Sequence, residues 1–131
     1  MFAIAGRGHR RDANYELAQV APHLSEAKKW GHSVELHGSY TSIIEKGSLL
    51  PEAAALEAAT GGRPKGNRQH WLRFDTHERL YRAVAEAGLN FDSTLGFSET
   101  VGFRNAAQVE RTIGTTAVTL TRDDVTELEA A

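Results

Sequence analysis

The sequence contains no cysteine and no long apolar run. Without cysteine, disulfides, thiolate catalysis and cysteine-built zinc sites are excluded, so any metal site must use histidine and carboxylate ligands. No apolar run approaches the roughly 18 residues that a membrane-spanning helix needs. The first residues, MFAIAG, are too short for a secretory signal. We therefore expect a cytoplasmic protein with no membrane partner.

An excess of charge of either sign is also lacking. Fifteen basic residues stand against seventeen acidic ones, which gives a formal net charge of -2. Because the chain has no excess of positive charge, its composition does not indicate binding to nucleic acid or to an anionic membrane surface. Arg7, Arg10 and Arg11 cluster locally, a pattern that a short solvated loop explains. With 131 residues, of which 40% are hydrophobic, the chain has the size and core of one ordinary domain.

Short apolar segments alternate with helix-like segments in the first hundred residues. Strands are predicted at 2–5, 33–37, 70–74 and 89–95, and helices at 15–30, 49–60 and 76–87. Pro22 is expected to break the first helix, and Thr76 to cap the third. The alternation is typical of βα units with parallel strands. Four strands cannot close an eight-stranded barrel, so we predict an α/β fold: an incomplete (β/α) barrel whose open sheet edge favours homo-oligomers.

Four motifs follow one another in a recognisable order. They are VELHGSY at 34–40, RQHWLRFD at 68–75, FDSTLGF at 91–97 and GFR at 102–104. In this order they resemble one branch of the polysaccharide deacetylase family, a class of carbohydrate esterases, over residues 1–104. The resemblance implies a metal-dependent hydrolase that acts on N-acetyl or O-acetyl sugars. It also implies a divalent metal, most often zinc, and a carbohydrate substrate.

The resemblance assigns roles to individual residues. His37 matches the metal-ligand motif, and Arg68 matches an arginine that stands behind a catalytic carboxylate. His70 and Asp92 match further catalytic positions, and Trp71 could stack on a sugar ring. We expect the two histidines and Asp92 to lie on one rim of the sheet. The alternatives are a structural role for each histidine, a turn role for Asp92 and a core position for Trp71.

The chain also departs from the deacetylase pattern. A second histidine is usual four residues after His37, where this sequence has Thr41. No Asp-Asp pair precedes His37, and Asp12 is a single acid in a loop. The chain thus lacks a base and a metal ligand, and we expect weak or absent metal binding. On this reading it is an inactive part of a longer reading frame, or an inactive remnant that persists as a non-catalytic module.

The last thirty residues, 102–131, resemble a different family, the C-terminal end of aldo-keto reductases. Under that alternative, Arg104 and Gln108 would contact the adenosine phosphate of NADP, although Arg111 and Thr112 depart from the usual residues. We expect a helical tail, with helices at 105–113 and from residue 121, joined by an extended link at 115–120. The predicted domains are therefore a deacetylase-like partial barrel at 1–103 and a helical tail at 104–131.

Overall fold

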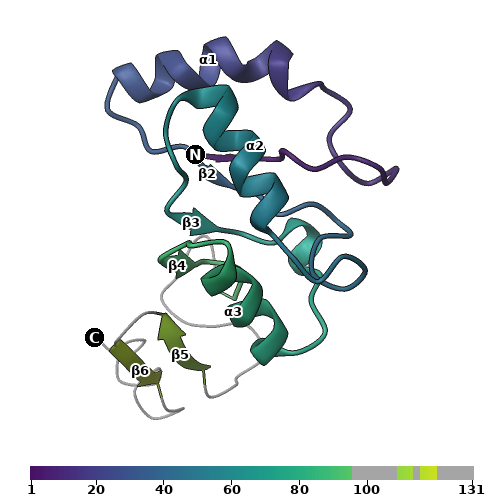
Figure 1. The fold of residues 1–131 in the computed structure, drawn as a ribbon, viewed down its shortest axis with the longest axis vertical. Helices are drawn as coiled ribbons and strands as arrows, with labels where there is room; N and C mark the ends of the chain where they lie inside the picture. Colours follow the sequence, from purple (N-terminus) through teal and green to yellow (C-terminus); the bar gives the residue numbers. More distant parts are fainter. Residues whose placement is uncertain (96–108, 114–115, 121–131) are drawn as a thin grey trace, which may run out of the picture.

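A parallel sheet of four short strands organises the first part of the chain (Figure 1). The structure is a computed structural model that describes residues 1–95, 109–113 and 116–120. The strands are β1 (Phe2–Ala3), β2 (Glu35–Leu36), β3 (Gly66–Asn67) and β4 (Phe91–Asp92), in the spatial order β1-β2-β3-β4. Ala3 is in register with Leu36, Leu36 with Asn67, and Asn67 with Asp92. The predicted α/β class with parallel strands is confirmed.

One helix connects each strand to the next. These helices are α1 (Leu17–Lys29), α2 (Leu50–Thr60) and α3 (His77–Glu86) (Figure 1). A single apolar core joins helices and sheet, and its members include Leu24, Leu56 and Leu80 from the helices, and Ala3 and Leu36 from the strands. As the alternation of residues 34–37 predicts, Val34 and Leu36 lie in this core. His37 therefore projects from the opposite face of the sheet.

Local signals set most of the helix ends. The Thr76 hydroxyl accepts a hydrogen bond from the Arg79 amide, so the predicted cap of α3 is confirmed. Gly61, with φ at +68°, ends α2 in the left-handed conformation that glycine tolerates best. The predicted break at Pro22 is wrong, because α1 runs through it. Pro22 lies on the exposed face of α1, where the carbonyl that loses its N–H partner can bond to water.

The third strand lies earlier in the chain than we predicted from residues 70–74. Strand β3 is Gly66–Asn67, and His70–Leu72 forms a single 3₁₀ turn, η1. Gly66 is required there, since a Cβ at this position would lie 2.1 Å from Cζ of Phe91 on the neighbouring strand. Trp71 and Leu72 have φ values of +60° and +53°, which turn the chain out of the sheet. The alternating apolar pattern of 70–74 thus belongs to a loop.

The predicted helix at 105–113 is wrong over its second half. Residues Val109–Ile113 form β5, which pairs antiparallel with β6, Thr116–Leu120. Valine, isoleucine and threonine are frequent in both segments, and branching at Cβ favours strands over helices. The predicted final helix, Arg104 and Gln108 lie outside the described residues. Within the described part of the chain, no helix is long and apolar enough to cross a membrane.

Two leucines on α2 provide a matched test of the core. Leu56 is 0% exposed and Leu50 is 48% exposed. We expect Leu56→Ala to lower the free energy of unfolding by about 2–5 kcal/mol, because it leaves a cavity between α2 and the sheet. Leu50→Ala should change it by no more than about 0.5 kcal/mol. Urea denaturation of both variants measures the difference, and equal losses would contradict the described packing.

Candidate functional site at the carboxyl edge of the sheet

The loops that follow β1, β2, β3 and β4 meet at one end of the sheet, the carboxyl edge. Ligands of open parallel sheets usually bind at this end. His37 is the first residue after β2, His70 follows β3 by three residues, and Asp92 is the last residue of β4. Their location on one rim agrees with our prediction. Their functional roles remain predictions.

His37 and His70 contact each other through their imidazole rings. Nε2 of His37 lies 3.0 Å from Nδ1 of His70, and Nε2 of His70 lies 2.6 Å from the carbonyl oxygen of Arg11. A carbonyl oxygen can only accept, so we assign the proton of His70 to Nε2. Nδ1 of His70 is then the acceptor for Nε2–H of His37. The remaining nitrogen of His37, Nδ1, is left with a lone pair.

That lone pair has no partner. Nδ1 of His37 is buried and receives no hydrogen bond within the described residues. Burial, and to a smaller extent the neighbouring His70, together lower the pKa of His37 to about 4 from its ordinary value of 6.5. Desolvation disfavours the charged imidazolium, so His37 is neutral at pH 7. Neutral imidazole is the form that binds metals.

The histidine pair meets only part of what a catalytic metal needs. The facing nitrogens are joined by the proton of His37, so they would have to separate before both could bind one ion. The Nε2–H bond of His70 to a carbonyl is a common support for a metal-binding histidine. A catalytic zinc normally has three protein ligands, however, and the described residues contain no group of three His, Asp or Glu side chains that could hold an ion. These residues therefore do not form a complete metal centre.

Arg68 and Asp92 have structural partners at this edge. The Arg68 guanidinium donates to the Ser93 carbonyl at 3.1 Å, and no ion pair joins it to a carboxylate among the described residues. The Asp92 carboxylate accepts from the Thr94 amide, the Thr94 hydroxyl and the Asn67 side chain, at 2.8–2.9 Å. This is the turn role that the Asp-Ser-Thr sequence allows. These hydrogen bonds tie both side chains to the loop that follows β4.

Two buried amides that sequence reasoning missed connect the loops. The Asn67 side chain accepts from the Gly38 amide and donates to Asp92. The Gln69 side chain donates to the Ser39 carbonyl at 2.7 Å and to the Ser42 hydroxyl at 3.1 Å. Both amides are almost completely buried, and buried polar groups with satisfied hydrogen bonds hold their surroundings rigidly. The only sequence signal was the unusual placement of two amides beside an apolar segment.

Aromatic and cationic side chains form a cluster next to the histidine pair. The cluster consists of His9, Arg11, Tyr40, Trp71 and Arg73. His9 stacks on Tyr40 with ring centroids 4.2 Å apart, and the Arg73 guanidinium lies 4.1 Å from the Tyr40 centroid. The Arg11 guanidinium lies 4.9 Å from the centroid of Trp71 and 5.0 Å from that of Tyr40. Arg11 thus contacts both aromatic rings from the loop that follows β1.

Trp71 combines exposure with backbone strain. Its side chain is 64% exposed, so it is not the core residue that one reading of the sequence suggested. Its φ of +60° lies in the left-handed region, which costs a non-glycine residue about 1–3 kcal/mol. The indole stands edge-on to His70, with ring centroids 6.2 Å apart. Strained conformations of this kind cluster at functional sites, which makes Trp71 a candidate for ligand contact.

Comparison with protein-family models, with curated proteins and with solved structures finds no match to this chain. The resemblance of residues 1–104 to polysaccharide deacetylases and of 102–131 to aldo-keto reductases therefore remains a hypothesis drawn from the sequence. The reductase alternative depends on Arg104 and Gln108, which the structure does not describe. The described geometry bears only on the deacetylase-like motifs.

The low pKa of His37 predicts a pH dependence of stability. In the unfolded chain His37 takes up a proton as the pH falls through 6.5, whereas in the folded protein it does so only near pH 4. The unfolded state binds more protons between these values, so stability falls as the pH falls from about 6.5 to about 4. We expect His37→Asn to lose less stability over this window than the native chain. Urea denaturation at pH 4 and at pH 6.5 measures this loss of stability. His23→Asn, at an exposed position on α1, is the control.

If His37→Asn and the native chain lose the same stability across that window, His37 is not the buried neutral group described here. The His23→Asn control should follow the native chain, because His23 lies on the solvent face of its helix.

Proposed function

We propose that the chain is a deacetylase-like domain that binds an acetylated carbohydrate at the carboxyl edge of its sheet. One observation supports this proposal most directly. His37 and His70 belong to two separate deacetylase-like motifs, 33 residues apart in sequence, and their rings lie in hydrogen-bond contact beside an exposed tryptophan. Both histidines follow neighbouring parallel strands, which brings them to one edge, and their rings are also close enough to hydrogen-bond. Their convergence supports reading them as parts of a single site.

Trp71 is the residue in this site best suited to bind a sugar. Sugars present apolar C–H faces that pack against aromatic rings, and a largely exposed indole offers such a surface. The left-handed backbone at Trp71 holds the indole outward, beside polar groups that could bond to hydroxyl or acetyl groups. Arg11 lies over the indole ring and donates to the Tyr40 hydroxyl, and both side chains add such polar groups.

The histidine pair links two of the loops that form this binding site. Because His70 donates to the Arg11 carbonyl, the loop that follows β1 is tied to the loop that contains Trp71. The pair offers two nitrogens toward one another, but the described residues supply no third metal ligand. No hydrolytic step is therefore assigned to these residues, and the proposal for them is recognition of the carbohydrate.

Two exposed tryptophans allow a matched test of carbohydrate binding. Trp71 is 64% exposed at the candidate site, and Trp30 is 72% exposed at the end of α1. We expect Trp71→Gly to weaken binding of an N-acetylated chito-oligosaccharide about tenfold or more, and Trp30→Gly to leave it unchanged. Glycine is chosen because it adopts φ near +60° without strain, so Trp71→Gly should unfold at nearly the same denaturant concentration as the native chain. Calorimetric titration and urea denaturation provide the two readouts.

Binding that survives in Trp71→Gly, or that disappears equally in Trp30→Gly, would contradict this assignment. Absence of any binding by the native chain to acetylated oligosaccharides would reject the proposed function itself.

A further inference from the structure

The loop that follows β1 contains three arginines next to the candidate sugar site. It supplies Arg7, Arg10 and Arg11, with Asp12 as the single acid between residues 7 and 14. Seven residues of this loop, which include Arg7 and Arg10 but not Arg11, line an open hollow of about 460 Å³, within the size range of small-ligand sites. We propose that this loop binds a negatively charged group of the carbohydrate, so that the substrate is an anionic oligosaccharide. This inference rests on the proposed function and specifies its substrate class.

Hydrogen bonds hold the loop in a defined turn. The Asp12 amide donates to the His9 carbonyl at 2.9 Å, which places Arg10 and Arg11 at the two central positions of the turn. The Asp12 carboxylate accepts from the His9 amide at 3.0 Å and from the Tyr40 amide at 2.8 Å. Both carboxylate oxygens are thus occupied by backbone groups that join this loop to the loop that follows β2. The turn is therefore built to present its two arginines outward.

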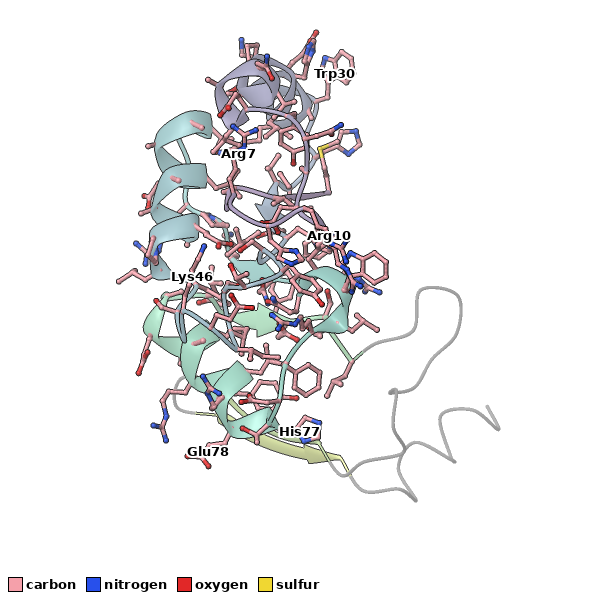
Figure 2. All side chains as sticks on the ribbon, turned by 90° about the vertical axis from the view of Figure 1, so that its right-hand side faces the viewer. Arg7, Arg10, Trp30, Lys46, His77 and Glu78 are labelled. Atoms are coloured by element: carbon pink, nitrogen blue, oxygen red, sulfur yellow. The ribbon has the colours of Figure 1, made fainter. Side chains whose placement is uncertain are left out.

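The turn keeps a net positive charge, because Asp12 is its one acid against Arg10 and Arg11. Arg7 forms an ion pair with Glu16, and Arg73 forms one with Glu45 at 3.2 Å. Within the described residues, Arg10 and Arg11 have no carboxylate partner, and Arg10 makes no side-chain hydrogen bond at all. Figure 2 shows Arg10 at mid-length of the molecule, between Trp30 at one end and His77 at the other. The chain as a whole carries a net charge of -2, so this positive patch opposes the overall charge.

The arginine side chains of this patch favour an anion that offers two oxygens as acceptors. A planar guanidinium donates two parallel hydrogen bonds to a carboxylate or to a sulfate ester. Arg11 also donates to the Tyr40 hydroxyl at 3.0 Å and lies 4.9 Å from the Trp71 ring centroid. Arg11 follows Arg10 in the chain and contacts the Trp71 ring, so an anion bound by Arg10 in the hollow would belong to a sugar next to the one that contacts Trp71. The substrate class that fits is an acetylated oligosaccharide that carries carboxylate or sulfate groups.

Three oligosaccharides of equal length test this inference. They are a neutral N-acetylated chito-hexasaccharide, a hyaluronan hexasaccharide with carboxylates, and a keratan sulfate hexasaccharide with sulfates and no carboxylate. We expect at least one anionic hexasaccharide to bind about tenfold tighter than the neutral one at about 50 mM salt, and this advantage to shrink at about 500 mM salt as charges are screened. The anion that shows the advantage identifies which oxygen group the loop prefers.

Substitutions in the loop test whether its arginines cause the tighter binding of the anionic hexasaccharides. Arg10→Gln should remove most of the anionic advantage while the neutral ligand binds as before, because Arg10 has no structural contacts to lose. Arg11→Lys keeps the charge but not the planar guanidinium, and should reduce the advantage further. Arg82→Gln is the matched control, since Arg82 is an exposed arginine on α3 that pairs with Glu78, and it should retain the full advantage.

Equal affinity for the neutral and anionic ligands, or an anionic advantage that persists in Arg10→Gln and Arg11→Lys, would overturn this inference and leave the proposed function standing. Failure of all three oligosaccharides to bind would reject both.

Discussion

The imidazole of His70 joins three loops at the carboxyl edge of the sheet. It donates to the carbonyl of Arg11 after β1, accepts from His37 after β2, and itself belongs to the segment after β3. Hydrogen bonds between ring nitrogens and backbone groups are directional, so they fix both the tautomer and the orientation of each ring. The positions of Arg11 and Trp71 relative to each other depend on this connection. The candidate sugar site and the arginine loop are therefore two parts of one hydrogen-bonded arrangement.

Two buried carboxylates, those of Glu52 and Glu35, also fix backbone segments near the sheet by accepting hydrogen bonds. The Glu52 carboxylate, on α2, accepts hydrogen bonds from the amide and the hydroxyl of Ser39. Burial raises the pKa of Glu52, while these bonds partly offset that effect. On β2, the Glu35 carboxylate accepts from the Lys65 and Gly66 amides at 2.6 and 2.8 Å. Burying a carboxylate without hydrogen bonds costs free energy, so each of these two carboxylates favours the backbone position that supplies its donors.

The sequence was most informative where local rules decide the structure. Thr76 and the spacing of Leu80 and Val84 predict α3, because a cap and an apolar face act within one helix. Strand β3 was misplaced, because its position depends on pairing with Leu36 and on the close approach of Phe91 to Gly66. Neither contact is local. The strand at 109–113 was missed because amphipathic spacing alone does not distinguish a helix from a short paired strand.

In the candidate site, too, the local features could be predicted from the sequence and the contacts between loops could not. The motifs placed His37 and His70 at the correct edge, since each follows a strand of a parallel sheet. The partners of Asn67 and Gln69 come from other loops, and only the fold determines which polar groups meet them. Asp92 was assigned to a site by its motif, but its local hydrogen bonds to Thr94 were foreseeable from the Asp-Ser-Thr sequence.

Nitrogen-15 NMR of the imidazole side chains reports which ring nitrogen of each histidine bears the proton, and so tests the hydrogen bonds of His70. At pH 7 we expect the proton on Nε2 in both His37 and His70, and a long-range signal between His37 and the acceptor nitrogen of His70. A His70 ring protonated on Nδ1 could not accept from His37 while bonding to the Arg11 carbonyl. That result would contradict the hydrogen-bond chain on which the site depends.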